Sequence, residues 1–339
     1  MSHRFSPTQL LGAGLLAMTP ALAQADIKVT ASFSILADMV SNVGGEHVEV
    51  DPLVGANGDT HVFSPSPKHV QALADADLVV FNGLQFEGWM ERLIKSSDYD
   101  GVLTTATDGI EALDYSDGGH DHDHSQGHDD HDGHAAHGDA DPHAWQDLSL
   151  AVTYVENIRD GLIEADPDHA SDYRDNAEHY IGEIKALDDE LQTRLGDLPA
   201  GSSVVTGHDS FGYFSDAYGI RFLSPSGLST EVDPSASDMA ELIDLIREQN
   251  IQALFHESMT NPSTLNQVAE EADLTIAGTL YADALAETGD ASTYLGMMRH
   301  NADLLHAALA DAEPAPEHAD HHDAHDHGGD HTHDHDHEH

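Results

Sequence analysis

Hydrophobic positions recur along most of the chain in two alternating patterns. Short apolar runs of strand type occupy residues 26–34, 47–54, 77–83 and 101–110 in the first half, and 202–210, 220–227, 251–258 and 274–283 in the second. Between them lie segments whose apolar residues are three or four positions apart, as in an amphipathic helix. Because strand–helix alternation favours parallel pairing, the pattern predicts an α/β fold with two lobes, each a mostly parallel sheet flanked by helices.

The longest helical pattern separates the two halves. From about Asp168 to Asp197, apolar residues recur at helical spacing, namely Tyr173, Ala177, Tyr180, Ile184, Leu187 and Leu191. At a rise of 1.5 Å per residue this helix is about 45 Å long, which is more than one small lobe needs. We therefore expect one long rigid helix over residues 166–198, which joins an N-terminal lobe (residues 26–165) to a C-terminal lobe (residues 199–312).

Three segments follow neither pattern. Residues 1–25 combine Arg4, a short apolar stretch and an A-x-A cleavage site at Ala23, which predicts a secretory signal peptide. A loop at about 114–140 and a tail at 313–339 are rich in His and Asp and lack the apolar residues of a core, so both are expected to be disordered. Candidates for auxiliary weak metal sites are the seven histidines of the loop: His120, His122, His124, His128, His131, His134 and His137.

The charge of the chain indicates which kinds of molecule it binds. The chain has 12 Lys and Arg against 63 Asp and Glu, which gives a formal charge of −51, together with 28 His and no Cys. Such a chain repels nucleic acid and attracts cations. Without Cys there is neither a disulfide nor a residue after the signal to carry a lipid. We expect an exported, soluble periplasmic protein that is monomeric, has no lipid anchor and binds no nucleic acid.

Four polar residues are candidates for a site, because ligands of parallel sheets gather beyond the carboxyl ends of strands. His61, His208 and Asp283 each follow a strand pattern, and His143 precedes a helical one. A lone His at a strand end is more often a hydrogen-bonded surface or core residue than a ligand. For His143, however, the preceding Pro142 fixes the backbone, which a disordered run would not require.

The four candidates divide between the lobes. His61 and His143 fall in the first lobe, whereas His208 and Asp283 fall in the second, so a site that uses all four would lie in the cleft between the lobes. His256 and Glu257 end a strand pattern on the same side of the second sheet. We expect these two residues to be candidates for supporting contacts behind the site.

The segments that contain these residues resemble the metal-binding class (cluster A-I) of periplasmic substrate-binding proteins that serve ABC importers. The resemblance rests on HVFSPSP, DPHAWQD, GHDSFGYF and the ending YADALAE…TYLGMMRHN, together with the His-rich loop and the long helix, and it covers the whole mature chain. It implies a metal in the cleft with four ligands, namely His61, His143, His208 and Asp283. Many relatives of the zinc branch have a disulfide in the second lobe, which this chain lacks.

The third ligand of the family bears on the metal. A His at this position marks the zinc branch and a Glu the manganese branch, so His208 implies Zn²⁺, in accord with the preference of borderline-soft imidazole ligands. Three imidazoles and one carboxylate complete a tetrahedral site with no open position for chemistry, so we expect a binding protein and not an enzyme. The implied function is high-affinity zinc capture in the periplasm and delivery to an ABC permease, with an accessory metallochaperone as a further candidate partner.

Three other functions stay open at this point. A zinc hydrolase would need an open metal position, and the chain has no H-E-x-x-H pattern. A periplasmic zinc buffer or metallochaperone without a transporter would have the same ligands. A manganese-binding relative is disfavoured by His208 and by the missing lipid-anchor cysteine.

Overall fold

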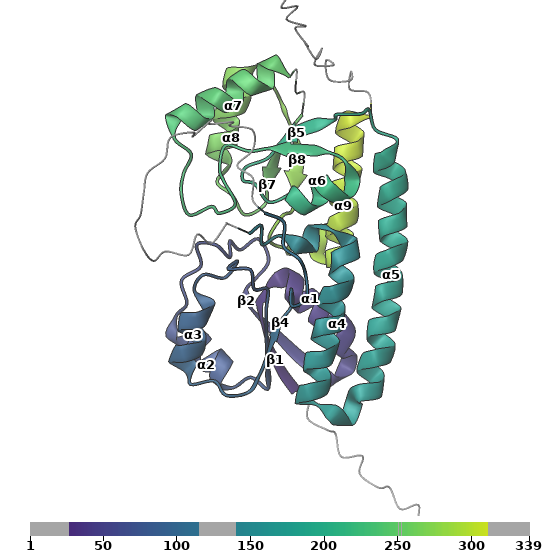
Figure 1. Ribbon diagram of the computed structural model, residues 1–339. Helices are drawn as coiled ribbons and strands as arrows, with labels where there is room; N and C mark the ends of the chain where they lie inside the picture. The colour runs from purple at the N-terminus through teal and green to yellow at the C-terminus, as the bar shows by residue number, and fades with distance from the viewer. Residues whose placement is uncertain (1–26, 115–139, 250, 252, 311–339) are drawn as a thin grey trace, which may run out of the picture.

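The computed structural model describes residues 27–114, 140–249, 251 and 253–310. The predicted signal peptide, the seven histidines of the loop and the His-rich tail therefore lie outside the described residues. Within the described ranges, the chain forms two α/β lobes stacked one above the other, with a long helix along one side of both (Figure 1). This arrangement confirms the predicted fold class.

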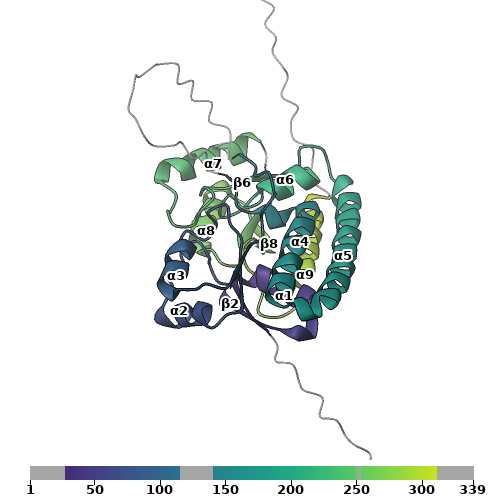
Figure 2. The same cartoon turned by 60° about the horizontal axis from the view of Figure 1, so that its bottom comes forward.

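The N-terminal lobe is built on a parallel sheet with the strand order β2-β1-β3-β4. Its strands are β1 (Ile27–Phe33), β2 (Val48–Val54), β3 (Leu78–Phe81) and β4 (Val102–Thr105). The central strand β1 is buried from Val29 to Phe33, as expected for a parallel strand covered on both faces. The helices α2 (Pro67–Ala74) and α3 (Met90–Ser97) lie on one side of this sheet, and α1 (Ser34–Gly44) and α4 (Leu148–Ala165) on the other (Figure 2).

The C-terminal lobe repeats this topology with the strand order β6-β5-β7-β8. Its strands are β5 (Ser203–Val205), β6 (Arg221–Leu223), β7 (Leu254–Glu257) and β8 (Ile276–Leu280), and its helices are α6 (Gly212–Tyr218), α7 (Ala236–Glu248), α8 (Pro262–Ala272) and α9 (Tyr294–Leu309). The strands are shorter than the eight- to ten-residue patterns that predict them. The reason is that the last residues of several patterns leave the sheet and form loops.

The predicted linking helix is α5 (Ala170–Gly196), preceded by a 3₁₀ turn at Pro167–His169. Its 27 residues correspond to about 40 Å. Its buried side chains are those at helical spacing, from Tyr173 to Leu195. The helix runs beside both lobes (Figure 1). The residue boundaries of the lobes stay predictions.

One hydrophobic core extends from the first lobe into the second. It includes Phe33 and Leu36 of the first lobe, Leu187 of α5, and Phe214 and Met297 of the second lobe. A smaller cluster, from Val205 to Ala269, fills the outer part of the second lobe around α7 and α8. Because the main core is continuous, the two lobes are held together by packing as well as by the chain. None of the helices in the described ranges combines the length and the apolar character needed to cross a membrane.

Candidate metal site

Four side chains from four separate loops meet between the lobes. His61 follows β2, His143 lies before α4, His208 follows β5 and Asp283 follows β8. Each contributes one ligand atom, and these atoms lie within 4.8 Å of one another, an arrangement found once among the described residues. The site lies beyond the carboxyl ends of β2, β5 and β8, where parallel sheets usually bind ligands. In the second sheet, β6 and β7 lie on opposite sides of β5, so the strand order reverses there.

The carboxylate of Asp283 is the centre of the group. Its Oδ2 lies 3.2 Å from His61 Nε2 and 3.2 Å from His208 Nε2, and its Oδ1 lies 3.6 Å from His143 Nε2. The centroids of the three imidazole rings are 5.5 to 5.6 Å apart. All three rings therefore present the same nitrogen to one point beside the carboxylate.

These converging atoms are buried and unsatisfied. The three Nε2 atoms and both Asp283 oxygens are shielded from solvent, and apart from their mutual contacts at 3.2 to 3.6 Å they have no hydrogen-bond partner. Leaving one buried polar group unpaired costs about 1–3 kcal/mol. Five such atoms around one point indicate a place for a cation, which would satisfy all of them together.

The charges of the site follow from its burial. Burial alone disfavours a charged His208, but Glu257 and Asp283 outweigh it and raise the pKa of His208 well above its ordinary value. Burial alone would likewise raise the pKa of Asp283, but His208 and His143 outweigh it and hold that pKa well below its usual range. Asp283 is therefore an anion at neutral pH, which is the form that binds a metal.

His143 is held from behind by Asp141. The Asp141 Oδ1 atom lies 2.7 Å from His143 Nδ1 and also accepts the backbone N–H of His143 at 2.9 Å. A ring that donates through Nδ1 leaves the Nε2 lone pair free to bind a metal. The Pro142 carbonyl accepts a hydrogen bond from Asn82 at 2.9 Å, so the backbone before His143 is also fixed. The helix that follows is capped by Asp147, whose side chain accepts the Ser149 N–H.

His208 is held in the same way by Glu257, which stands at the end of β7. Glu257 Oε2 contacts His208 Nδ1, and Oε1 accepts the backbone N–H groups of Gly207 and His208 at 2.8 and 3.1 Å. Successive side chains of a strand point to opposite faces. His256 consequently points away from Glu257 and is not brought into the group.

His61 has a different environment. Its backbone N–H donates to Asp59 Oδ1 at 2.9 Å, and the neighbouring Thr60 carbonyl accepts a hydrogen bond from Trp89 Nε1 at 2.9 Å. The other oxygen of Asp59 accepts the Thr230 hydroxyl of the second lobe at 2.7 Å. The side chain of His61 is 6% exposed, whereas those of His143 and Asp283 are fully buried. His61 is therefore the member of the group that lies nearest to solvent.

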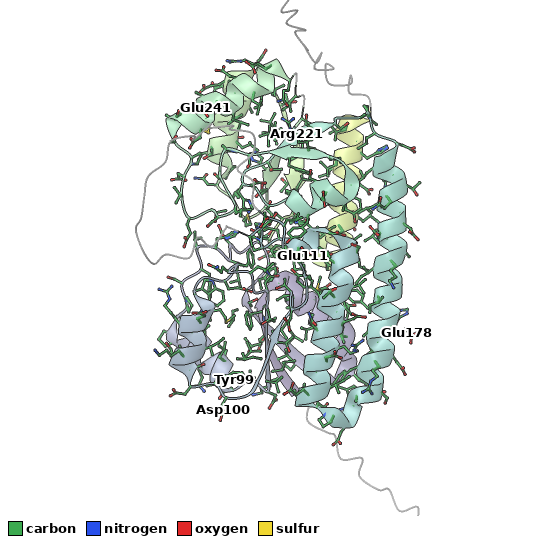
Figure 3. All side chains as sticks on the ribbon, viewed as in Figure 1. Tyr99, Asp100, Glu111, Glu178, Arg221 and Glu241 are labelled. Atoms are coloured by element: carbon green, nitrogen blue, oxygen red, sulfur yellow. The ribbon has the colours of Figure 1, made fainter. Side chains whose placement is uncertain are left out.

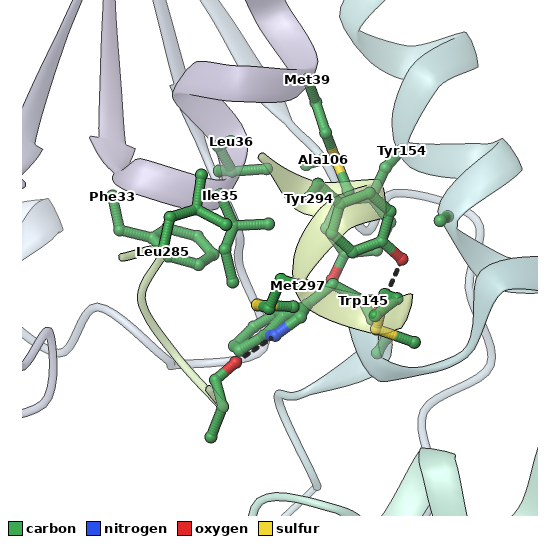
Figure 4. Packing of buried hydrophobic residues seen from close by; sticks show 14 of the residues in the cluster. Phe33, Ile35, Leu36, Met39, Ala106, Trp145, Tyr154, Leu285, Tyr294 and Met297 are labelled. Carbon is green, nitrogen blue, oxygen red and sulfur yellow. Dashed lines mark hydrogen bonds between the residues drawn. The ribbon is translucent and has the colours of Figure 1, made fainter. Parts of the chain in front are cut away.

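Two residues of DPHAWQD connect the site across the lobes. Trp145 Nε1 and Gln146 Nε2 both donate to the carbonyl of Ala282 at 2.9 Å, directly before Asp283. Trp145 packs in the buried cluster with Phe33, and Tyr294 donates to its carbonyl (Figure 4). The segment that carries His143 is thereby joined to the loop that carries Asp283.

Sequence reasoning missed three of these supporting residues, namely Asp141, Trp145 and Gln146. An Asp two positions before a His is a local signal for Asp141, because its side chain can accept the N–H two residues on. No local signal exists for the contacts of Trp145 and Gln146, since their acceptor lies more than 130 residues away.

Comparison with known proteins gives consistent results at the level of sequence and of structure. Residues 29–308 match the family described as "ZnuA: Zinc-uptake complex component A periplasmic". The chain is 32% identical over 287 residues to the manganese-binding lipoprotein MntA of Halalkalibacterium halodurans, a match that covers 84% of this chain and 89% of that protein. It is 31% identical over 281 residues to the iron-binding protein YfeA of Yersinia pestis, covering 82% and 85%.

The solved structure of the periplasmic zinc-binding protein TroA from Treponema pallidum superposes with a TM-score of 0.75 at 27% identity, covering 84% of this chain and 99% of that one. The two relatives and this structure are named for manganese, iron and zinc, respectively. Together with the match over residues 29–308, they show that the chain belongs to the ZnuA family, the metal-binding substrate-binding proteins of ABC importers.

Proposed function

We propose that the protein captures Zn²⁺ in the periplasm through His61, His143, His208 and Asp283 and delivers it to the permease of an ABC importer. The observation that carries this proposal is the set of three buried Nε2 atoms and one buried carboxylate without hydrogen-bond partners. The family to which the chain belongs consists of solute-binding proteins rather than enzymes. The ion is accordingly cargo that is bound and released unchanged.

The ligand set and its spacing favour zinc. Zinc is usually bound by four ligands in a tetrahedron at about 2.0–2.2 Å, which places neighbouring ligand atoms about 3.3–3.6 Å apart. Asp283 Oδ2 lies 3.2 Å from His61 Nε2 and 3.2 Å from His208 Nε2, close to these values, and the four candidate ligand atoms all lie within 4.8 Å of one another. Three imidazoles also suit zinc better than manganese, which prefers carboxylate, carbonyl and water oxygens.

Manganese is the second candidate, because several relatives are named for it. MntA of H. halodurans is a manganese-binding lipoprotein by name and shares 32% of its aligned residues with this chain. The second oxygen of Asp283 could complete a higher coordination number, which manganese prefers. Affinity alone does not separate the two candidates, since zinc exceeds manganese at almost any site of nitrogen and oxygen ligands.

Coordination geometry and metal content separate them. Protein purified from periplasm of cells grown with both metals should contain one tightly bound zinc after mild chelation. The Co²⁺-substituted protein should show the intense visible absorption of a tetrahedral site, and His208→Glu should weaken this absorption. Manganese retained in the native protein, together with the weak cobalt spectrum of a six-coordinate site, would overturn the zinc proposal in favour of manganese.

Location and delivery need their own test. The relative from H. halodurans is named a lipoprotein, whereas this sequence contains no cysteine. We propose that the protein is not anchored to the membrane by a lipid, so osmotic shock should release it from cells without detergent. A gene deletion should slow growth under zinc limitation, and a permease deletion should give the same defect. A normal growth rate in the strain that lacks the permease would favour a zinc buffer.

Two further roles stay proposals. They are auxiliary metal binding by the loop histidines, for example His120 and His137, and loading of the site by a metallochaperone.

A further inference from the structure

Asp141, the residue behind His143, is itself held by the second lobe. The buried hydroxyl of Tyr213 on α6 donates to the Asp141 carbonyl at 3.0 Å and accepts the N–H of Leu113 at 3.0 Å. The N–H of Asp141 in turn donates to the Leu113 carbonyl at 2.9 Å. One tyrosine hydroxyl thus fixes the backbone of Asp141 from across the boundary between the lobes.

The carboxylate of Asp141 meets the neighbouring residue of α6. A Cβ atom on Gly212 would lie 2.4 Å from Asp141 Oδ2, a distance at which something has to move. Gly212 has no left-handed backbone conformation, so the requirement for glycine here is one of space. We call Gly212 and Tyr213 together the socket of Asp141. Gly212 leaves the space that the Asp141 carboxylate occupies, and the Tyr213 hydroxyl donates a hydrogen bond to the Asp141 carbonyl.

The socket connects two ligands of the site. Gly212 and Tyr213 follow His208 by four and five residues, whereas Asp141 precedes His143 by two. The position of the Asp141 carboxylate decides whether His143 keeps its proton on Nδ1 and directs Nε2 at Asp283. We propose that the Gly212–Tyr213 socket is a positioning element that orients His143 for the metal from the segment that carries His208, an inference that rests on the proposed function.

A hydroxyl deletion with a matched control tests the role of Tyr213. Tyr218 lies on the same helix, is also buried, and its hydroxyl donates to Asp188 at 2.9 Å, away from the metal ligands. Zinc-loaded full-length Tyr213→Phe and Tyr218→Phe proteins are mixed with excess chelator after weakly bound zinc has been removed. Tm should decrease by a similar amount in both variants. Only Tyr213→Phe should release its tightly bound zinc several-fold faster than the unsubstituted protein.

A double-mutant cycle tests the role of Gly212 independently. Asp141→Ala should weaken zinc binding by about 10–100-fold, as loss of such an outer contact commonly does. Gly212→Ala should weaken binding in the native background, because the new methyl group displaces the carboxylate. In the Asp141→Ala background there is no carboxylate to displace, so the added effect of Gly212→Ala should largely disappear.

The outcomes separate the two proposals. Equal zinc release from Tyr213→Phe and Tyr218→Phe, or an equal cost of Gly212→Ala in both backgrounds, overturns the socket and leaves zinc capture intact. An unsubstituted protein without one tight zinc per chain overturns the proposed function, and the socket proposal fails with it.

Discussion

At the scale of single residues, the histidines of the site differ in what stands behind them. His143 and His208 each have a carboxylate at Nδ1, from Asp141 and Glu257, whereas the backbone of His61 is held by Asp59. A carboxylate at this position fixes the tautomer and increases the basicity of the ligand nitrogen. The two histidines without solvent access are therefore the ones whose rings are held by a carboxylate.

Substitution of Glu257 should show this contribution. Glu257→Gln offers one oxygen where two are needed, because Glu257 accepts both backbone N–H groups and contacts the His208 ring. We expect zinc affinity to fall by about 10–100-fold in competition with a fluorescent chelator. The exposed Glu231→Gln is the matched control and should bind as the unsubstituted protein does. Equal affinities in both variants would contradict a role for Glu257.

The pKa of His208 predicts how metal binding depends on pH. Burial disfavours the charged ring, but Glu257 and Asp283 raise the pKa of His208 well above 6.5. A metal binds only the neutral imidazole and must displace this proton. Metal affinity should therefore fall as the pH decreases through the raised pKa, at a higher pH than for an ordinary histidine.

Calorimetry in buffers of different ionisation enthalpy measures this proton directly. At pH values below the raised pKa of His208, each zinc should release at least one proton, and His208→Ala should reduce the number. Binding that releases no proton at pH 6.5 would show that the ring is neutral before the metal arrives.

At the scale of elements, α5 and the continuous core restrict how the lobes move. The helix buries residues from Tyr173 to Leu195 against both lobes, and the Trp145 and Gln146 side chains connect the His143 and Asp283 loops. Bending a helix of this length would break its hydrogen bonds or expose apolar surface. Metal binding is therefore expected to order loops near His61 and to cause a small tilt, without wide opening.

Small-angle scattering of the metal-free and zinc-bound protein tests this expectation. The radius of gyration should change little between the two states, while hydrogen exchange should slow in the loops around His61 and Asp283. A change of several ångström on zinc binding would contradict the account of a rigid helix.

At the scale of the whole molecule, charge is the dominant feature. The formal charge is −51, and acidic side chains such as Glu178 on α5 and Asp100 in the first lobe point away from the body of the protein (Figure 3). Several of the few arginines form ion pairs with acidic side chains, for example Arg299 with Glu190 and Arg194 with Asp303. The remaining acidic groups repel one another and oppose the compact state.

Screening of this repulsion should stabilise the fold. The Debye length falls from about 10 Å at 0.1 M salt to about 3 Å at 1 M, so we expect Tm of the metal-free protein to increase over this range. Thermal unfolding followed by circular dichroism in NaCl and in KCl measures it, and both salts should act alike. A Tm that is constant or decreases with salt would show that the net charge does not limit stability.

The sequence by itself determined the features that depend on local pattern. The strand–helix alternation and the spacing of apolar residues in α5 arise from which faces of each element are buried, and these periods can be counted along the chain. His61, His143, His208 and Asp283 were singled out as ligands by short segments that resemble a family, and the structure brings these four together. Their role as ligands stays a prediction.

Only the tertiary structure decided which residues support that group. Glu257 contacts His208 while His256 does not, because β7 points successive side chains to opposite faces. Trp145 and Gln146 reach Ala282, and Gly212 and Tyr213 receive Asp141, across 71 to 137 positions of sequence. The period of the apolar residues indicates which face of a segment is buried. The contacts of Trp145, Gln146, Gly212 and Tyr213 depend instead on how the two lobes pack against each other, and no local pattern predicts that packing.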